Sequence, residues 1–231
     1  MKHQKRKQLG LILLCLTLCG CSPSLPSETE TTKQTPVTED GSYSVLTVDG
    51  GDLSGERQPN VKVDIGYGDR EYWAYTNAYG QLVKVTAKEI ILQDDRTEPV
   101  TSDGRYYHDE AKVPGVEQPD LDEGHVIADS LGGVSNAYNI TPQDSILNRH
   151  GDQAYMEKVI RDAGGCTDFT AVITYPDTET QIPSHYDYTY TIHGEEIHDS
   201  FDNQNPEKSP IERMDEFFSK DKNRNRQYLF D

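Results

Sequence analysis

Apolar and polar residues alternate along the first half of the chain as they do in half-buried β-strands. Val61, Val63 and Ile65 are separated by Lys62 and Asp64. Further short apolar runs that predict strands occupy residues 72–76, 82–85 and 89–92. Together these runs predict a sheet of neighbouring strands in this half of the chain.

The second half of the chain mixes strand and helix patterns. Three more strands are predicted at residues 169–175, 186–192 and 197–201. Met156, Val159 and Ile160 give an apolar face to a helix predicted from Asp152 to Arg161. Strands with few helices between them predict an α+β fold.

The N-terminal segment has the pattern of a secretion signal. Residues 1–8 are basic, and residues 9–18 form an apolar run too short to span a bilayer comfortably. The run ends in Leu18-Cys19-Gly20-Cys21, which resembles a bacterial lipobox. That resemblance implies that residues 1–21 are a lipoprotein signal peptide and that Cys21 is lipidated. An uncleaved membrane anchor is the alternative, and both interpretations place the domain outside the cytoplasm.

Composition divides the rest of the chain into three segments. Residues 22–41 are rich in Ser, Thr, Pro and Glu and predict a disordered tether. Residues 42–205 hold the strand patterns and are expected to form the folded domain. Ser209-Pro210-Ile211-Glu212 predicts a helix start, so residues 206–231 are assigned to an amphipathic helix and a basic tail.

The chain is strongly acidic, with 40 Asp and Glu against 22 Lys and Arg and a formal net charge of −18. This charge excludes a protein that coats nucleic acid through a broad basic face, because like charges repel. It does not exclude a site that meets a phosphate locally through a metal. Three of the four cysteines lie in the N-terminal segment, so Cys166 is expected to be a small packed residue without a disulfide partner.

Residue types that carry chemistry are concentrated between residues 122 and 157. Asp122-Glu123-Gly124-His125 supplies an imidazole beside a glycine, which removes bulk next to the ring. Gly132-Gly133 permits a sharp reversal before Asn139-Ile140-Thr141-Pro142-Gln143. Asn148 and Glu157 follow.

This order of residues resembles the DNA/RNA non-specific endonucleases, which carry the ββα-metal, or His-Me finger, motif. Their signature is Asp-Arg-Gly-His, a Gly-rich reversal, an Asn-containing strand and a further Asn at the crossing helix. Residues 139–143 match the second segment without a change, and the match extends over residues 121–165. The resemblance implies an α+β domain with a central antiparallel sheet, an embedded ββα-metal motif and few helices.

The resemblance also implies a role for each matching residue. His125 is expected to be the general base, and Asn139 to orient its imidazole, for example through the backbone carbonyl. Asn148 is expected to be the direct protein ligand of one Mg²⁺ ion, with Mn²⁺ as an alternative. Glu157 is expected to hold metal-bound waters, and Arg161 to pair with Glu157 or to bind phosphate.

The implied activity is metal-dependent hydrolysis of phosphodiester bonds in DNA, with RNA as a further substrate, at the cell surface. Little sequence preference is expected, because nothing in the chain resembles a base-reading element. The membrane is an expected partner through the lipid on Cys21. The sequence predicts neither a biological role, nor an oligomeric state, nor a protein partner or inhibitor.

Glu123 departs from the family pattern, which has Arg at this position. A carboxylate there adds repulsion near a polyanion. Either Glu123 pairs with a basic residue such as Arg105, in the loop of residues 97–122, or the site has lost activity. Arg105 is also a candidate for the missing phosphate contact.

Two other functions stay open at this stage. The acidic charge and Glu123 are compatible with a catalytically impaired surface lipoprotein that binds nucleic acid or a protein partner. The four residues that match the family's catalytic pattern favour an active enzyme instead. A zinc hydrolase is the third interpretation, although the spacing of the late histidines does not match a closed zinc site; these are His185, His193 and His198.

Overall fold

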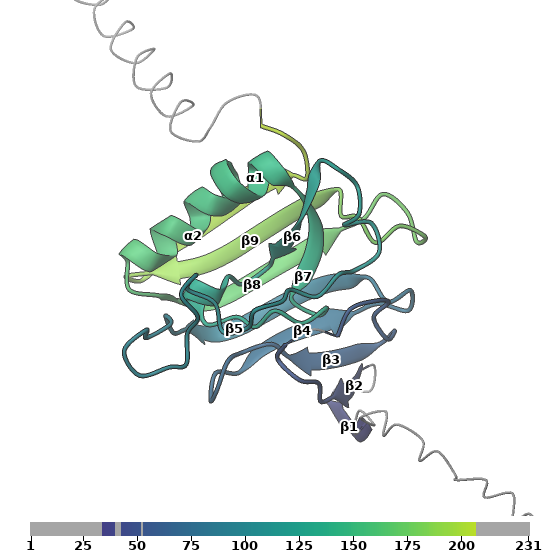
Figure 1. Cartoon of the computed structure of the whole chain (residues 1–231), viewed down its shortest axis with the longest axis horizontal. Helices are drawn as coiled ribbons and strands as arrows, with labels where there is room; N and C mark the ends of the chain where they lie inside the picture. The colour runs from purple at the N-terminus through teal and green to yellow at the C-terminus, as the bar shows by residue number, and fades with distance from the viewer. Residues whose placement is uncertain (1–33, 40–42, 52, 207–231) are drawn as a thin grey trace, which may run out of the picture. The chain divides into compact units, whose positions relative to one another are not determined.

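The computed structural model describes residues 34–39, 43–51 and 53–206 (Figure 1). Its strands are β1 (Gln34–Glu39), β2 (Tyr43–Leu46), β3 (Val61–Asp64), β4 (Tyr72–Thr76), β5 (Leu82–Ile90), β6 (Leu121–His125), β7 (Ile140–Asp144), β8 (Cys166–Thr174), β9 (His185–Ile192) and β10 (Glu195–Asp202). Its helices are α1 (Ser145–His150), α2 (Asp152–Asp162) and a 3-10 turn, η1 (Asp129–Leu131). The predicted signal with Cys21 and the predicted C-terminal helix lie outside the described residues. No helix among those residues has the length and hydropathy needed to cross a membrane.

Eight strands form one sheet in the order β1-β2-β3-β4-β5-β8-β9-β10. All neighbours are antiparallel except β2 and β3, which run parallel. The expected α+β fold around an antiparallel sheet is therefore confirmed, with one parallel pair. The structure differs from the predicted tether at residues 34–39, because β1 pairs with β2 there. An edge strand bonds on one side only and so tolerates Pro36.

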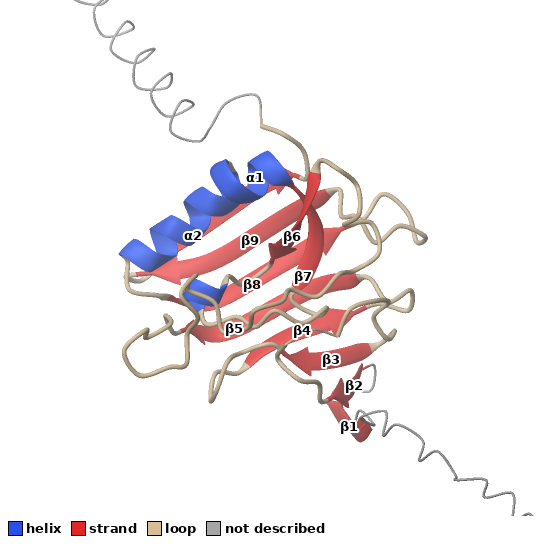
Figure 2. Ribbon diagram, in the orientation of Figure 1, coloured by secondary structure: helices blue, strands red, loops and turns tan. Residues whose placement is uncertain are grey.

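A second, two-stranded sheet carries the chemically interesting residues. β6 and β7 pair antiparallel, so that His125 lies opposite Ile140. The chain then runs directly from β7 into α1 and α2. Figures 1 and 2 show these strands and helices together over one face of the large sheet, which is the expected ββα arrangement.

Alternate side chains of β9 seat the helices on the sheet. Tyr186, Tyr188 and Tyr190 are each at most 1% exposed. They belong to the same apolar core as Met156 and Ile160 of α2. The predicted apolar face of this helix is therefore buried at Met156 and Ile160 and half-buried at Val159.

Two local features place α1 and α2 in series. The Asp144 side chain accepts hydrogen bonds from the backbone N–H groups of Ile146 at 2.9 Å and Leu147 at 3.0 Å, which caps α1. Gly151 lies between the two helices. A larger residue does not fit there without a shift, because a Cβ would lie 2.7 Å from Leu147 Cα. The short helix α1 was not predicted from the sequence.

A buried arginine ties β7 to the large sheet. Arg57 is 5% exposed, and its guanidinium donates to the carbonyl of Ala137 at 2.6 Å and to that of Ile140. It also donates to Gln181 Oε1 at 2.9 Å, in the connection between β8 and β9. Because Ile140 pairs with His125, this guanidinium helps to fix the strand on which the imidazole depends.

Candidate active site

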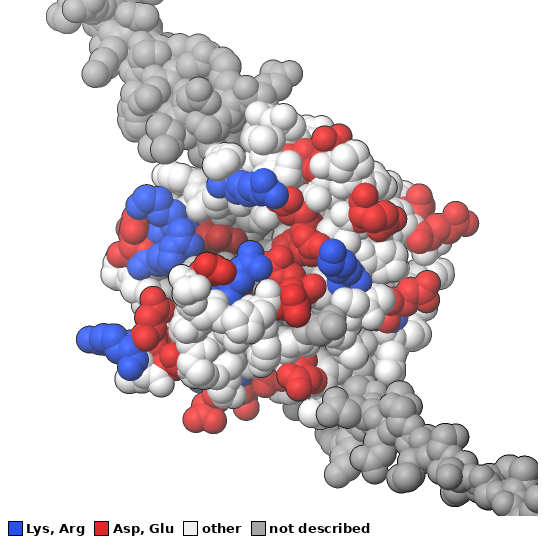
Figure 3. Space-filling view, viewed as in Figure 1, with Lys and Arg blue, Asp and Glu red and all other residues white. Residues whose placement is uncertain are grey.

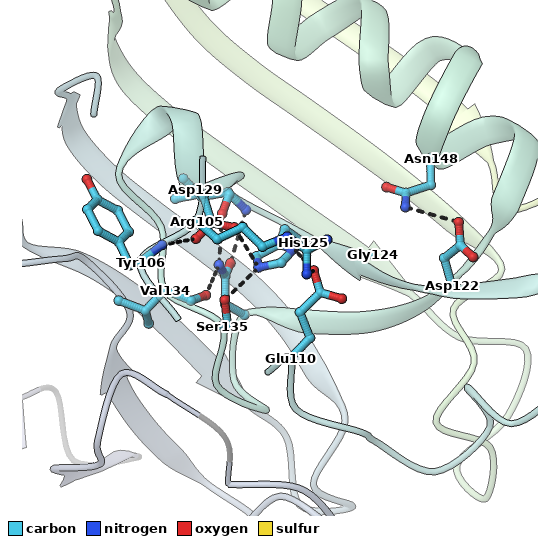
Figure 4. Close-up of polar contacts among 12 residues, drawn as sticks. Arg105, Tyr106, Glu110, Asp122, Gly124, His125, Asp129, Val134, Ser135 and Asn148 are labelled. Carbon is cyan, nitrogen blue, oxygen red and sulfur yellow. Dashed lines mark hydrogen bonds and ion pairs between the residues drawn. The ribbon is translucent and has the colours of Figure 1, made fainter. Parts of the chain in front are cut away.

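His125 ends β6 with its imidazole only 10% exposed. The Nε2 atom lies 3.3 Å from Ser135 Oγ and 3.4 Å from Asp129 Oδ2. The Nδ1 atom lies 3.8 Å from Glu110 Oε1 (Figure 4). Both ring nitrogens therefore face oxygen atoms of the protein.

Burial decides the charge of this imidazole. Desolvation lowers the pKa of His125 to about 4, against the raising effect of Glu110. Arg105 lowers the pKa further and Glu123 raises it. Burial thus takes the pKa of His125 below the near-neutral range that is usual for histidine. A neutral imidazole at pH 7 still has a free lone pair, so it can accept a proton.

Asn139 binds the chain beside His125 rather than the imidazole. Its side chain accepts from Ile127 N–H at 3.0 Å and donates to the carbonyls of Ile127 at 2.8 Å and Val134 at 2.6 Å. Its backbone carbonyl accepts from Val126 N–H at 2.8 Å. The predicted contact between this carbonyl and the imidazole is therefore absent. Asn139 instead closes the segment of residues 126–134 into a loop.

Asn148 lies on α1 and faces the start of β6. Its Nδ2 atom is 3.5 Å from Asp122 Oδ2, while the amide oxygen is turned away from Asp122 (Figure 4). Asp122 is held by Arg149 through contacts of 2.7 Å and 2.6 Å. The amide oxygen of Asn148 is the kind of hard donor that a hydrated Mg²⁺ ion accepts.

Glu157 is connected to His125 through one glutamine. Gln153 Nε2 donates to Glu157 Oε1 at 2.9 Å and to the His125 carbonyl at 3.2 Å. Burial raises the pKa of Glu157 to about 7, although the hydrogen bond from Gln153 and the charge of Arg161 lower it. Arg161 Nη1 lies 3.7 Å from Glu157 Oε2, so the predicted pair is present. A nearby cation would stabilise the ionised carboxylate.

Arg105 does not pair with Glu123. Its Nη1 atom lies 2.8 Å from Glu110 Oε1, and the nearest base to Glu123 is Lys112, with Nζ 4.0 Å from Oε1. The prediction failed because the observed partners, Glu110 and Lys112, come from an irregular loop with no periodicity. Arg105 nevertheless lies close enough to His125 to influence its pKa.

Each basic residue around the site stands next to an acid. The four pairs, Arg149–Asp122, Lys112–Glu123, Arg105–Glu110 and Arg161–Glu157, are made at distances of 2.6 to 4.0 Å. Figure 3 shows Lys and Arg interspersed with Asp and Glu on this face. The cations of this face are therefore single and each stands beside an acid, and they do not form a continuous basic surface.

The described residues offer little support for thiol or zinc chemistry. They contain no group of three or more His, Cys, Asp or Glu side chains able to hold a metal ion. Cys166 is buried, and burial raises the pKa of its thiol to about 12. The oxygen donors on α1 and α2 are instead of the kind that binds one hard cation with most of its water retained. These donors are the amide oxygen of Asn148 and the carboxylate of Glu157.

Sequence reasoning missed four side chains that contact His125 or its carbonyl. Asp129 follows His125 by four residues, which is the only local signal among them. The other three lie 10 to 28 residues from His125 and are brought to it by the fold. The four side chains are those of Glu110, Asp129, Ser135 and Gln153.

Comparison with known proteins gives a match to one family model and matches to several solved structures, two of which follow. Residues 59–194, more than half of the chain, match the family model described as DNA/RNA non-specific endonuclease. Crystal structures of NucA from Streptococcus agalactiae with magnesium bound and with no metal bound both give a TM-score of 0.43. The first is 16% identical, over 64% of this chain and 78% of that one; the second is 18% identical, over 64% and 77%. No curated protein matches the sequence. On the sequence match, the chain belongs to the DNA/RNA non-specific endonuclease family.

Proposed function

We propose that this endonuclease is metal-dependent, uses His125 as its general base and works at the outer face of a bacterial membrane. The observation that carries the proposal is the setting of His125. Its imidazole is neutral at pH 7 because of burial, and Gln153 connects its backbone to the carboxylate of Glu157. A proton acceptor and an acidic group are thus held in a fixed relation.

The imidazole supplies the proton acceptor for water attacking the phosphorus. A buried, neutral ring takes a proton without first losing one. Glu110 on one side and Asp129 on the other stabilise the imidazolium that forms, since each carboxylate lies within 3.8 Å of a ring nitrogen.

Asn148 and Glu157 would hold the metal, Asn148 directly and Glu157 through water. Mg²⁺, or Mn²⁺ in its place, would supply stabilisation of the negative charge that develops at the phosphate. A bound cation would stabilise the buried carboxylate of Glu157, because Arg161 at 3.7 Å only partly offsets the cost of burying its negative charge. Asn148 favours a hydrated ion because an amide oxygen is a neutral ligand.

Arg105 and Arg161 are the proposed phosphate contacts. The side chains of Arg105 and Arg161 are 41% and 38% exposed. Both guanidinium groups are therefore accessible to a polyanion although each is paired with a carboxylate. DNA is the proposed substrate, with RNA as a further one, since cationic contacts to phosphate carry no sequence information. Binding through a few cations in an acidic protein should weaken steeply as salt rises.

A lipid on Cys21 is the proposed anchor. The apolar run before Leu18-Cys19-Gly20-Cys21 supports it. Cys21→Ser should release the protein into the medium or leave an unprocessed precursor, because stable anchoring needs more than one acyl chain. Wild-type protein found wholly in the medium, with an N-terminus far from Cys21, would contradict the anchor.

The function is tested with supercoiled plasmid and purified protein, in Mg²⁺ and in Mg²⁺ with excess chelator. The proposal expects nicking and linearisation that chelator abolishes and that Mn²⁺ restores. Cleavage unaffected by chelator contradicts metal dependence. Binding of plasmid without cleavage in either condition supports the impaired lipoprotein instead.

A further inference from the structure

The first residue after β10 fills the bonding positions along the outer edge of β7. Among the described strands, β7 pairs with β6 alone. At its other edge, Asn203 Oδ1 accepts from Asp144 N–H at 2.8 Å, and Asn203 Nδ2 donates to the carbonyl of Pro142 at 3.0 Å. The carbonyl of one residue and the N–H two residues later point to the same side of a strand. One side-chain amide therefore bonds to β7 as the backbone of a neighbouring strand would.

The amide of Asn203 is itself fixed to the large sheet. Its Nδ2 also donates to the carbonyl of Pro183 at 2.9 Å, and its backbone N–H donates to the carbonyl of Ser184 at 3.0 Å. The amide group of an asparagine offers two N–H donors and one oxygen, and here each of the three has a partner. Because Pro183 and Ser184 lead directly into β9, Asn203 joins the edge of β7 to the large sheet.

The same segment also contacts the far end of α1. A Cβ at Gly151, the residue that follows α1, would lie 3.1 Å from Pro206 Cγ. Residues 203–206 therefore touch the chain just before α1, at Asp144, and just after it, at Gly151. Figure 1 shows the chain leaving β10 beside this helix.

α1 needs such support because it is short. It has six residues, of which Leu147 is buried. Isolated helices of fewer than about 12–15 residues are only marginally stable in water. The direction of the Asn148 amide, in the middle of α1, therefore depends on what fixes the two ends of the helix.

We propose that Asn203 is a positioning residue that holds α1, and with it the Asn148 amide, in place for metal binding. It acts through the backbone of residues 142–144. The inference rests on the proposed role of Asn148 as a metal ligand. Asn203 lies beyond residues 59–194, the part of the chain that matches the family model, so it adds a residue from outside that region to the site.

The test is the affinity of the full chain for Mn²⁺ without DNA, followed by the electron paramagnetic resonance signal of free Mn²⁺. Asn203→Asp keeps an acceptor for Asp144 N–H, but it loses both donors and sets a carboxylate against two carbonyl oxygens. We expect Mn²⁺ to bind about tenfold more weakly, since changes behind a metal ligand cost about 10- to 100-fold. The Mg²⁺ concentration for half-maximal plasmid cleavage should rise in parallel, with a smaller change in the rate at saturating Mg²⁺.

Asn77→Ala is the matched control. Asn77 also makes three side-chain hydrogen bonds, but in the turn between β4 and β5, and its loss should leave Mn²⁺ affinity unchanged. Wild-type Mn²⁺ affinity in Asn203→Asp overturns the inference, even if urea stability falls, because Asn203 then supports the fold alone. If Asn203→Asp does not fold by circular dichroism, Asn203→Leu, of similar size and without charge, is titrated instead, and wild-type affinity there overturns the inference.

Asn148→Ala separates this inference from the proposed function. Unchanged Mn²⁺ affinity in Asn148→Ala refutes Asn148 as a ligand, and the proposed metal site with it. Weaker binding in Asn148→Ala together with wild-type binding in Asn203→Asp refutes only the role of Asn203. The double variant should bind Mn²⁺ no more weakly than Asn148→Ala alone, since both changes act on one ligand. A further loss in the double variant contradicts a route through Asn148.

Discussion

Replacing Asn139 with alanine should unfold the loop on which the site depends. The side chain makes three hydrogen bonds, to Ile127 N–H, to the Ile127 carbonyl and to the Val134 carbonyl, at 3.0, 2.8 and 2.6 Å. Asn139 is 0% exposed, so water does not readily replace them. Each of the three backbone groups left without this partner costs about 1–3 kcal/mol, giving roughly 3–9 kcal/mol in all. That is a large part of the 5–15 kcal/mol or so that stabilises a typical domain.

The assay is urea unfolding, followed by fluorescence of the single tryptophan, Trp73, and by circular dichroism. Asn77→Ala is the matched control. Asn77 also makes three side-chain hydrogen bonds, to Tyr79 N–H, Gln81 N–H and Gln81 Oε1, but in a solvent-accessible turn. The Asn77→Ala protein should lose about 1 kcal/mol of unfolding free energy and keep full activity. An Asn139→Ala protein within about 1 kcal/mol of wild type would refute the reasoning, especially if activity were lost.

Three further substitutions test other parts of the account. Asn148→Ala should lower plasmid cleavage more than about tenfold and raise the Mg²⁺ concentration required, with unchanged urea stability; unchanged Mg²⁺ dependence would exclude it as a ligand. Because burial raises the pKa of Glu157 to about 7, the folded chain keeps a proton there that the unfolded chain loses near pH 4.5, so the free energy of unfolding should fall as pH rises between these values. Glu157→Gln should remove that part of the fall, measured without divalent cations, and identical slopes would contradict the shift. Glu123→Arg places a second cation beside Lys112 and should raise cleavage at low salt, with the gain fading as salt increases; a gain that persists at high salt would point to a different cause.

The strands were predictable because burial on one face imposes a period of two residues. Tyr186, Tyr188 and Tyr190 show this in β9, where each fully buried position is aromatic. β5 was predicted as two runs, yet it is one strand from Leu82 to Ile90. Exposed Lys88 and Glu89 interrupt the apolar pattern there without interrupting the backbone pairing with β8.

Local motifs predicted the elements of the site but not its contacts. The helix carrying Glu157 and Arg161 was predicted from its apolar face, and their pairing is observed. α1 was missed because a six-residue helix shows less than two turns of periodicity. Its position depends on Asp144 and Gly151, which the sequence analysis did not single out.

The surroundings of His125 depend on tertiary structure. Glu110 reaches Nδ1 from an irregular loop, and Ser135 reaches Nε2 after a reversal of the chain. Neither distance is encoded in spacing along the sequence. The same burial explains why the pKa of His125 is lowered to about 4 although an exposed histidine would titrate near neutrality.

The most direct test of the account is plasmid cleavage by His125→Ala, with and without added imidazole. The account predicts loss of cleavage in Mg²⁺ with wild-type stability, and partial recovery when imidazole enters the space left by the side chain. Asn148→Ala should show no such recovery, since imidazole does not replace an amide oxygen. Cleavage by His125→Ala within a few-fold of wild type, in the absence of imidazole, would contradict the assignment of His125 as the base.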